Sequence, residues 1–440
     1  MSAKQSDKIK RSLLPLRRFL RRFPAPVFAI KWLVISVVIG IGVGTASAFF
    51  LTALAWATNW RENHLWIIAL LPVGGFVVGY IYHVLGKDVE AGNNLLIENI
   101  HDPKEIIPFK MAPLVLLGTI ATHFFGGSAG REGTALQMGG SIADQITRLF
   151  RLHPRDRKLL LIAGMSAGFG SVFGTPLAGA IFGLEVFFLG RLQYDAIFPA
   201  FASSVIADYV THSWQVGHTY YHVPEVPELT VVHVLYVLLT GAGFGFCALL
   251  FSESVHATGR FFKRIISYPP LRLFAGGTIV AAAVWAAGTT KYIGLGIPTI
   301  EAAFEAPLPL YDFAAKIAFT AVTLGSGFKG GEVTPLFYIG ATLGNAFSNF
   351  IPLPVGLLAA MGFVAVFAGA ANTPLACSIM AIELFGASSG VYTGLACVVA
   401  YLFSGHTGIY GSQVIGQPKH LLFRRHAGRK LSELKRRRKN

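Results

Sequence analysis

The chain has 440 residues, of which 53% are hydrophobic and only 13% charged, and its mean hydropathy is +0.56. This composition excludes a set of ordinary soluble domains and predicts an all-α polytopic membrane protein. The formal net charge of +15 is concentrated in two terminal stretches too short to fold as a soluble basic domain, which excludes a nucleic-acid-binding protein.

The two ends of the chain carry most of the cations, in a basic N-terminal tail over residues 1–30 and a basic C-terminal tail over residues 413–440. Because Lys and Arg beside membrane segments stay in the cytoplasm, both tails predict cytoplasmic termini and an even number of crossings of a cell membrane, the inner membrane of a bacterium. The three cysteines, Cys247, Cys377 and Cys397, lie in apolar stretches without metal-ligand spacing, so we expect no disulfide and no metal site.

The first half of the membrane portion, residues 31–211, is a series of apolar stretches of unequal length. Several are near a dozen residues, shorter than the roughly 20 that a full crossing requires, so we expect tilted, re-entrant and half-helices. A polar break at residues 90–94 indicates unwound backbone that lines a cavity, because lipid cannot satisfy it. The expected segments are 31–56, 65–84, 95–99, 111–125, 135–150, 159–173, 176–190 and 196–211.

The second half, residues 230–412, follows a hydrophilic connecting loop at residues 212–229. We expect the loop and its histidines, His218 and His222, to be solvated. A Gly-Leu-Gly-Ile-Pro break at residues 294–298 stands where the first half has its polar break. The expected segments are 231–251, 273–287, 313–324, 335–349, 355–371, 374–385 and 391–403.

A duplicated pattern indicates that the two halves are repeats. One set of residues recurs at a constant offset: Gly127, Gly130, Glu132, Thr134, Leu136 and Gly140 return as Gly327, Gly330, Glu332, Thr334, Leu336 and Gly340. A second block, Thr-Pro-Leu-Ala followed by Ile, Glu and Phe, occurs at residues 175–187 and again at 373–385. Duplicated halves with Gly or Pro breaks in corresponding segments are typical of transporters whose site lies at the membrane midplane.

The breaks carry the candidate anion site. Helix N-termini, backbone N–H groups and hydroxyls can bind an anion without holding it too tightly, and the helix openings at residues 91–94, 130–134 and 330–334 converge if the halves are antiparallel. Glu132 is expected just before a helix start, where its own carboxylate would occupy this site. The carboxylate would leave the site when protonated, so the movement of an anion would be coupled to that of a proton. The alternative is an ion pair of Arg131 with Glu132 that only holds the turn.

The other repeated acids have weaker claims to carry ions. Lys329 lies three residues before Glu332 and could neutralise it. Glu185 and Glu383 follow the Thr-Pro-Leu-Ala blocks symmetrically, so we expect them to cap or brace helices rather than bind ions.

Three motifs in combination resemble the CLC family of anion channels and proton-coupled anion exchangers: Gly-Arg-Glu-Gly at residues 130–133, Gly-Glu-Val-Thr-Pro at 331–335 and Pro-Leu-Ala-Gly at 176–179. The resemblance covers about residues 31–412. It implies the CLC fold, with two antiparallel repeats and a homodimer whose subunits each have an anion pathway. It also implies that Glu132 is the gating and proton-coupling glutamate and that the Tyr410 hydroxyl lines the central site, although Tyr410 could instead be an interfacial aromatic.

Departures from the chloride-transporting members narrow the resemblance. The Gly-Ser-Gly-Ile-Pro loop of those members is replaced by Glu-Ala-Gly-Asn-Asn, so Ala91 takes the place of the serine and Asn93 offers an amide. Val333 stands where the chloride-transporting members usually have phenylalanine. Val186 stands at the position of the internal acid of the chloride/proton exchangers. This set is similar to the fluoride-exporting branch, and fluoride, being small and strongly hydrated, requires compact donors such as amides, backbone N–H groups and the Thr334 hydroxyl.

The sequence therefore predicts a secondary active transporter that exports fluoride in exchange for protons, in a lipid bilayer, without a cofactor and without ATP. Beside the gate Glu132, the expected anion-binding residues are Ala91, Gly92, Asn93, Arg131, Gly133, Val333, Thr334 and Tyr410. A chloride or nitrate exchanger and a passive CLC channel remain the alternatives. An intramembrane enzyme is a remote alternative, because neither a His-Glu-x-x-His nor a Gly-x-Ser-x-Gly motif occurs, although His123 lies near Glu132 in the sequence.

Overall fold

The computed structural model of the chain describes residues 24–102, 105–150 and 152–437, and it confirms the all-α prediction. Most of the predicted N-terminal tail, residues 1–23, lies outside the described residues. The first half contains α3 (Pro24–Asn63), the 3-10 helix η1 (Leu65–Leu70), α4 (Leu71–Leu85), α5 (Asn93–His101), α6 (Met111–Phe124), α7 (Glu132–Leu149), α8 (Pro154–Phe173), α9 (Pro176–Glu185), β1 (Phe188–Leu189), η2 (Tyr194–Ala196) and α10 (Ile197–Ser213).

The second half has the same succession of long and short helices. It contains α11 (Val231–Ile265), α12 (Pro269–Ala287), α13 (Ile297–Glu305), α14 (Asp312–Ser326), α15 (Val333–Phe347), α16 (Val355–Ala371), α17 (Pro374–Phe385), η3 (Ala387–Ser389), α18 (Gly390–Phe403), β2 (Val414–Ile415), η4 (Leu421–His426) and α19 (Leu431–Arg437).

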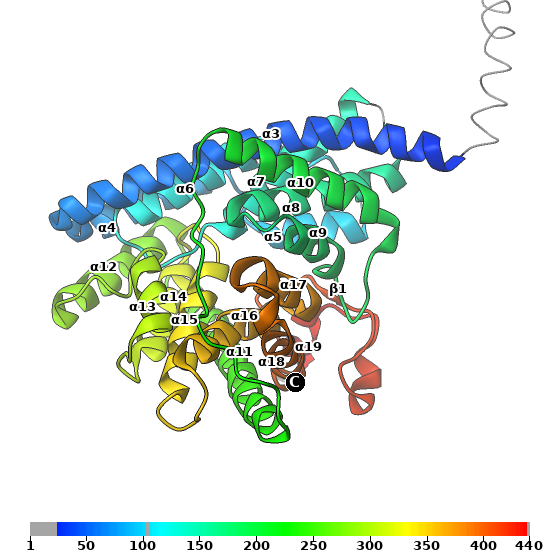
Figure 1. The fold of residues 1–440 in the computed structure, drawn as a ribbon. Helices are drawn as coiled ribbons and strands as arrows, with labels where there is room; N and C mark the ends of the chain where they lie inside the picture. The colour runs from blue at the N-terminus through cyan, green and yellow to red at the C-terminus, as the bar shows by residue number, and fades with distance from the viewer. Residues whose placement is uncertain (1–23, 103–104, 151, 438–440) are drawn as a thin grey trace, which may run out of the picture.

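Corresponding helices of the two halves pack against corresponding neighbours. In the first half α3 packs against α10 and α7 against α8, while in the second half α11 packs against α18 and α15 against α16. The short helices α9 and α17, which follow the duplicated Thr-Pro-Leu-Ala blocks, pack against each other across the boundary. In Figure 1 the first half occupies the upper part of the molecule and the second half the lower part.

Helices too short to cross a membrane accompany the long ones, as the segment lengths predicted. Within the described residues, four segments are long and apolar enough to span a bilayer: 25–63, 65–85, 231–265 and 269–287. The helices α5 and α13 have nine residues each, and each follows a glycine with a positive φ, Gly92 at 59° and Gly296 at 75°. Glycine adopts a positive φ without steric cost, so the chain can change direction at each break before a short helix starts, which confirms the two expected breaks.

Several helix boundaries differ from those expected, and α3, for example, extends beyond both ends of the expected span 31–56. The helix α11 continues to Ile265 instead of ending near residue 251, because polar residues lower the hydropathy there but no proline interrupts the helix before Pro269. The helix α7 begins at Glu132, three residues earlier than expected, so Glu132 is the first residue of a helix and not the residue before it.

Most residues of the loop between α10 and α11 are exposed, as expected, but a few of its side chains pack against the helices, so the prediction of solvation is wrong for His218. His218 Nε2 lies 3.0 Å from the Ser171 carbonyl oxygen, and the ring of Tyr221 stacks on Phe304 with centroids 5.2 Å apart. Of the two histidines, His222 is exposed as expected and His218 is partly buried. The apolar residues of this loop hold it against the helices, and Figure 1 shows it running from α10 down across the second half to α11.

The segment after α18 returns to the first half. Strand β2 pairs in parallel with β1, with Phe188 opposite Val414 and Leu189 opposite Ile415, and Leu431 of α19 is buried beside them. The end of the second repeat is thus fixed to the end of α9.

Candidate anion site

The two glycine turns meet and hydrogen-bond to each other. Gly130 N donates to the Gly331 carbonyl oxygen at 2.6 Å, and Gly331 N donates to the Gly130 carbonyl oxygen at 2.8 Å. The approach is so close that a Cβ at Gly331 would lie 2.7 Å from Gly133 N. Only glycine permits this contact, which brings the N-terminus of α7 against the N-terminus of α15.

The Glu132 carboxylate lies at the N-terminus of the opposite helix, α15. Its Oε2 accepts hydrogen bonds from Thr334 N and from Arg131 N, both at 3.1 Å, and its Oε1 accepts one from the Thr334 hydroxyl at 2.5 Å. The side chain is 0% exposed. The carboxylate therefore occupies a buried position whose donors are backbone N–H groups, a hydroxyl and the positive end of a helix dipole.

The ion pair between Arg131 and Glu132 is also present, but it is the weaker contact. Arg131 Nε lies 3.5 Å from Glu132 Oε1, and the arginine side chain is 18% exposed. Arg131 Nε is buried without a hydrogen-bond partner among the described residues. The alternative interpretation, a pair that only holds its own turn, does not account for the three closer bonds, two of which come from the other repeat.

The start of α5 places Asn93 against the start of α7. The Asn93 Nδ2 atom is 3.1 Å from the position that a Cβ of Gly133 would take, and Asn93 Oδ1 is buried without a hydrogen-bond partner in the described part of the chain. Gly92 lies against the Gln137 side-chain amide. Ala91 is exposed, and its carbonyl oxygen accepts only the turn bond from Asn94 N at 3.2 Å.

Tyr410 reaches the same place from the segment after α18. It is 2% exposed, so it is a buried residue and not an interfacial aromatic. Its hydroxyl has no hydrogen-bond partner among the described atoms, and it lies within electrostatic range of the Glu132 and Glu332 carboxylates. Val333, the first residue of α15, is fully buried beside Thr334. The expected residues thus come together, except Ala91, which lies at the surface of the same break.

A clamp that the sequence did not reveal joins α5 to the segment that carries Tyr410. Asn94 Oδ1 accepts a hydrogen bond from Ser412 N at 3.0 Å, and Glu98 Oε1 accepts one from the Ser412 hydroxyl at 3.0 Å and lies 3.1 Å from Lys430 Nζ. Near Glu132, the hydroxyls of Thr119 and Thr134 lie 2.6 Å apart. The polar pair Asn93 and Asn94 was the only signal in the sequence, and only Asn93 was assigned a role.

The expectation that Lys329 neutralises Glu332 is wrong. Lys329 Nζ lies 4.0 Å from the centroid of the Tyr82 ring, and no ion pair joins it to a carboxylate in the described part of the chain. Three residues separate the two side chains, but the backbone turns between them and the lysine side chain packs toward α4.

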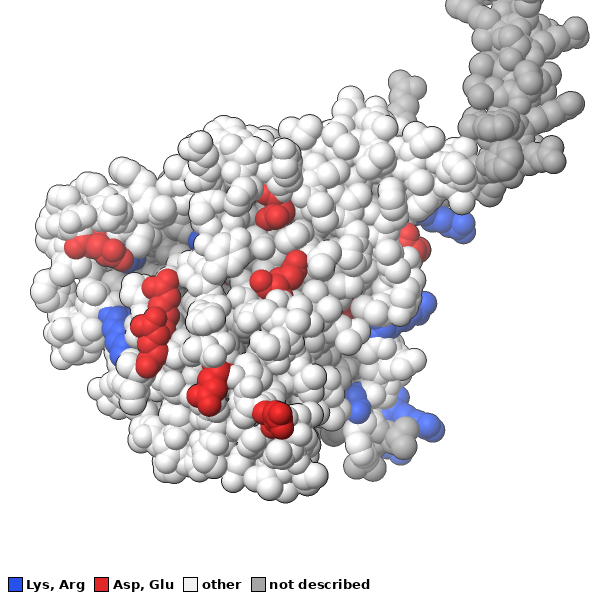
Figure 2. Space-filling view, viewed as in Figure 1, with Lys and Arg blue, Asp and Glu red and all other residues white. Residues whose placement is uncertain are grey.

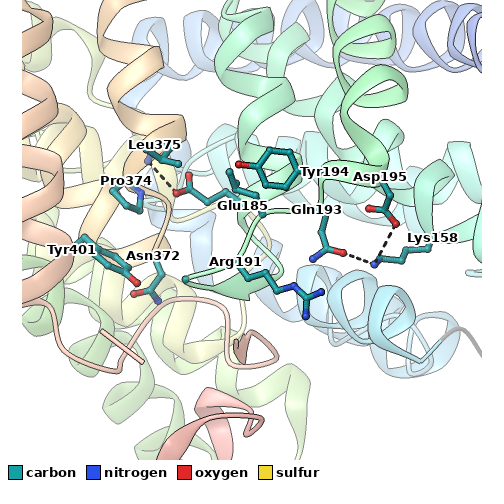
Figure 3. Close-up of a pocket in the computed structure, with 12 residues that line it drawn as sticks. Lys158, Glu185, Arg191, Gln193, Tyr194, Asp195, Asn372, Pro374, Leu375 and Tyr401 are labelled. Carbon is teal, nitrogen blue, oxygen red and sulfur yellow. Dashed lines mark hydrogen bonds and ion pairs between the residues drawn. The ribbon is translucent and has the colours of Figure 1, made fainter. Parts of the chain in front are cut away.

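Glu185 and Glu383 cap each other's helices, as the symmetric positions predicted. Glu185, at the end of α9, accepts hydrogen bonds from Leu375 N at 3.1 Å and Ala376 N at 2.8 Å at the start of α17. Glu383, near the end of α17, accepts them from Leu177 N at 3.0 Å and Ala178 N at 2.8 Å. Figure 3 shows Glu185 reaching Leu375 beside a cavity of about 770 Å³.

His123, which lies near Glu132 in the sequence, does not pair with it in the structure. His123 is fully buried, and none of the hydrogen bonds of Glu132 involves its ring. Among the described residues, no group of three His, Cys, Asp or Glu side chains could hold a metal ion.

Two inverted repeats that join their glycine turns around a buried carboxylate define a membrane ion-transport protein. A family profile described as the voltage gated chloride channel matches residues 74–405. The chain therefore belongs to this family, the CLC family that its motifs resemble.

Comparisons with individual proteins place the chain near fluoride-handling relatives. A protein of Pseudomonas syringae pv. tomato named chloride/fluoride channel protein is 55% identical over 89% of this chain and 88% of its own length. An H+/Cl− exchange transporter of Cronobacter sakazakii is 28% identical over 84% of each chain. The crystal structure of a CLC-type fluoride/proton antiporter is 33% identical, with a TM-score of 0.85 over 87% of this chain and 98% of that one.

Proposed function

We propose that this chain exports fluoride in exchange for protons and that Glu132 is the group for which the two ions compete. The observation that carries the proposal is the position of the Glu132 carboxylate, which accepts bonds from Thr334 N, the Thr334 hydroxyl and Arg131 N. The same donors would serve a fluoride ion, because both ligands are compact, charged acceptors of hydrogen bonds.

Protonation decides which ligand occupies the position. A protonated Glu132 loses its negative charge and one acceptor site, so its bonds to the α15 N-terminus weaken and fluoride can take its place. Returning the proton on the other side restores the carboxylate, which displaces the anion. One carboxylate then links an anion moving outward to a proton moving inward.

An orphaned hydroxyl supports a fluoride pathway. The Tyr410 hydroxyl can donate a hydrogen bond but is buried without a partner among the described residues, although buried polar atoms are rarely left unpaired. An ion in the pathway would accept from the Tyr410 hydroxyl and from the Asn93 amide. The small side chains of Gly92, Gly133 and Val333 leave space for the ion, and their backbone N–H groups can donate to it. Arg131 adds a positive charge at the edge of the pathway.

The remaining features follow from the family and from the charge pattern. We propose a homodimer in the inner membrane, no enzymatic activity, repeats at residues 31–211 and 230–412, and both termini in the cytoplasm. Figure 2 supports this orientation, because on the face shown more of the Lys and Arg lie along the edge beside the grey N-terminal trace than at the opposite end, and most Asp and Glu lie away from that edge.

Efflux from liposomes tests the proposal. Purified protein is reconstituted in vesicles loaded with fluoride or chloride, and anion release and proton uptake are recorded together. We expect fast fluoride release with proton uptake and little chloride release. Fluoride release without proton uptake would indicate a channel, as the Pseudomonas relative is named, and equal chloride release would remove the argument from Asn93.

A further inference from the structure

A basic cavity of about 440 Å³ lies apart from the Glu132 site, between α4, α11, α12 and the turn that follows α14. Cations from the turn after α4, from α11, from α12 and from the turn after α14 line it, together with a single acidic residue, Glu90. The five cations are Lys87, Arg260, Lys263, Arg272 and Lys329.

None of these cations forms an ion pair in the described part of the chain, and Glu90 acts on Lys329 only from a longer distance. Within the described residues no carboxylate oxygen lies within 4.0 Å of any of their side-chain nitrogens. Arg272 donates to the carbonyl oxygens of Ile266 and Ser267 at 2.7 and 2.6 Å, which fixes it at the end of α11. Lys87, Arg260 and Lys263 are exposed. Other lysines of the chain are paired, such as Lys110 with Asp88 at 2.8 Å, so the cavity is a local excess of positive charge.

The cavity lies on the same side of the membrane as the start of α3. Lys31, in the second turn of that helix, is ion-paired with Asp156 at the start of α8, and the neighbouring Arg157 donates to the Glu105 carbonyl oxygen. Residues 105 and 110 lead into α6, and Lys110 reaches Asp88, next to Lys87 of the cavity. In the proposed orientation this side faces the cytoplasm.

Exposed apolar side chains lie within two residues in sequence of residues that line the cavity, and we call them its apolar rim. Exposed residues on the helices that form it are Leu85 of α4, Phe261 and Ile265 of α11, and Leu271 and Phe274 of α12. In a membrane these side chains contact acyl chains, so the cavity opens where lipid tails and headgroups meet. A soluble phosphate would gain nothing from this apolar rim, whereas a phospholipid would.

We propose that the basic cavity binds the phosphate of an anionic phospholipid headgroup, with the acyl chains on the apolar rim. Lys and Arg side chains from separate helices would surround the phosphate oxygens, as basic pockets between membrane helices do at the cytoplasmic side. Lys329 connects this site to the ion pathway through the backbone, because it precedes Gly330 and Gly331 in the turn that holds Gly130.

Lipid retention by the full-length protein tests the site without any transport measurement, so its outcome is independent of the proposed ion exchange. The protein is equilibrated with phosphatidylglycerol or phosphatidylcholine in detergent, and bound lipid is counted by native mass spectrometry. We compare two triple variants of equal net charge: Lys87, Arg260 and Lys263 to Gln in the cavity, and as control the exposed Arg148, Arg191 and Arg264 to Gln outside it.

Because each cation near a headgroup is worth about a fivefold change in affinity, the cavity variant is expected to bind phosphatidylglycerol roughly a hundredfold more weakly. The control keeps wild-type binding, and phosphatidylcholine binds weakly to all three proteins. Equal phosphatidylglycerol retention by the two variants would overturn the site. Displacement of the lipid by glycerol phosphate at equal concentration would overturn the lipid assignment in favour of a soluble phosphate. If the triple variant does not fold, the single variants R260Q and K263Q replace it. Each is expected to bind phosphatidylglycerol roughly fivefold more weakly than the wild type.

Discussion

Replacing Glu132 with Gln should separate anion flow from proton flow. The substitution keeps the size of the side chain but removes its charge and turns one oxygen into an N–H donor. In the structure both oxygens face donors: Oε2 faces two backbone N–H groups, and Oε1 faces the Thr334 hydroxyl and the Arg131 guanidinium. An amide nitrogen in the place of Oε2 would face two N–H donors, whereas in the place of Oε1 it could donate to the Thr334 hydroxyl but would face the Arg131 guanidinium.

The magnitude follows from the three bonds that the carboxylate accepts. A hydrogen bond to a charged acceptor is worth about 1 kcal/mol more than one to a neutral acceptor, so the three together weaken the hold of the side chain by about 3 kcal/mol. That is roughly a hundredfold shift in the competition between the side chain and fluoride. We expect fluoride to pass the variant down its gradient, with no linked proton movement.

The assay records fluoride with an ion-selective electrode and protons with a pH electrode on the same liposome suspension. Glu185→Gln is a matched control, because Glu185 is also a buried carboxylate that accepts backbone N–H bonds at a helix start, but away from the glycine turns. The control is expected to keep the wild-type ratio of proton to fluoride flux. A Glu132→Gln protein that still drives fluoride uphill with a pH gradient would refute the reasoning.

Three further substitutions test separate parts of the structure. Val333→Phe adds volume at a fully buried position beside Thr334, where overpacking costs about 1–3 kcal/mol, and should slow fluoride release from liposomes; unchanged flux and coupling would show that Val333 does not restrict the path. Asn94→Ala leaves Ser412 N without its acceptor and loosens the segment of Tyr410, so fluoride turnover should fall, and wild-type turnover would argue against the clamp. Glu383→Ala and Glu185→Ala should lower the free energy of unfolding by similar amounts, about 0.5–2 kcal/mol each, in thermal unfolding in detergent, and a large difference between them would contradict their equivalence.

The sequence predicted well the features that depend on residues close together in the chain and the features whose pattern occurs in both repeats. The helices α16 (Val355–Ala371) and α17 (Pro374–Phe385) begin and end where the apolar run, the break and the proline indicated. The capping roles of Glu185 and Glu383 could be inferred because each follows the same block at the same spacing. A pattern that occurs in both halves shows which residues matter before any contact is known.

Contacts between distant segments could not be predicted in this way. The bond of Ser412 N to Asn94 joins residues 318 positions apart, and neither has a counterpart in the other repeat that would mark it. The direction of Lys329 also depends on tertiary packing, since the Tyr82 ring that attracts it belongs to another helix. The full length of α11 was missed because hydropathy measures a membrane span and not the helix that continues beyond it.

The paired contacts between the halves have a geometric meaning. The bonds between Gly130 and Gly331, like the caps of Glu185 and Glu383, are nearly the same contact made twice across a pseudo-two-fold axis. A polypeptide of half this length would leave its glycine turn and its helix start without partners, and a second copy in the opposite orientation would supply both. The two halves therefore contact each other as the subunits of an antiparallel homodimer would, within one chain.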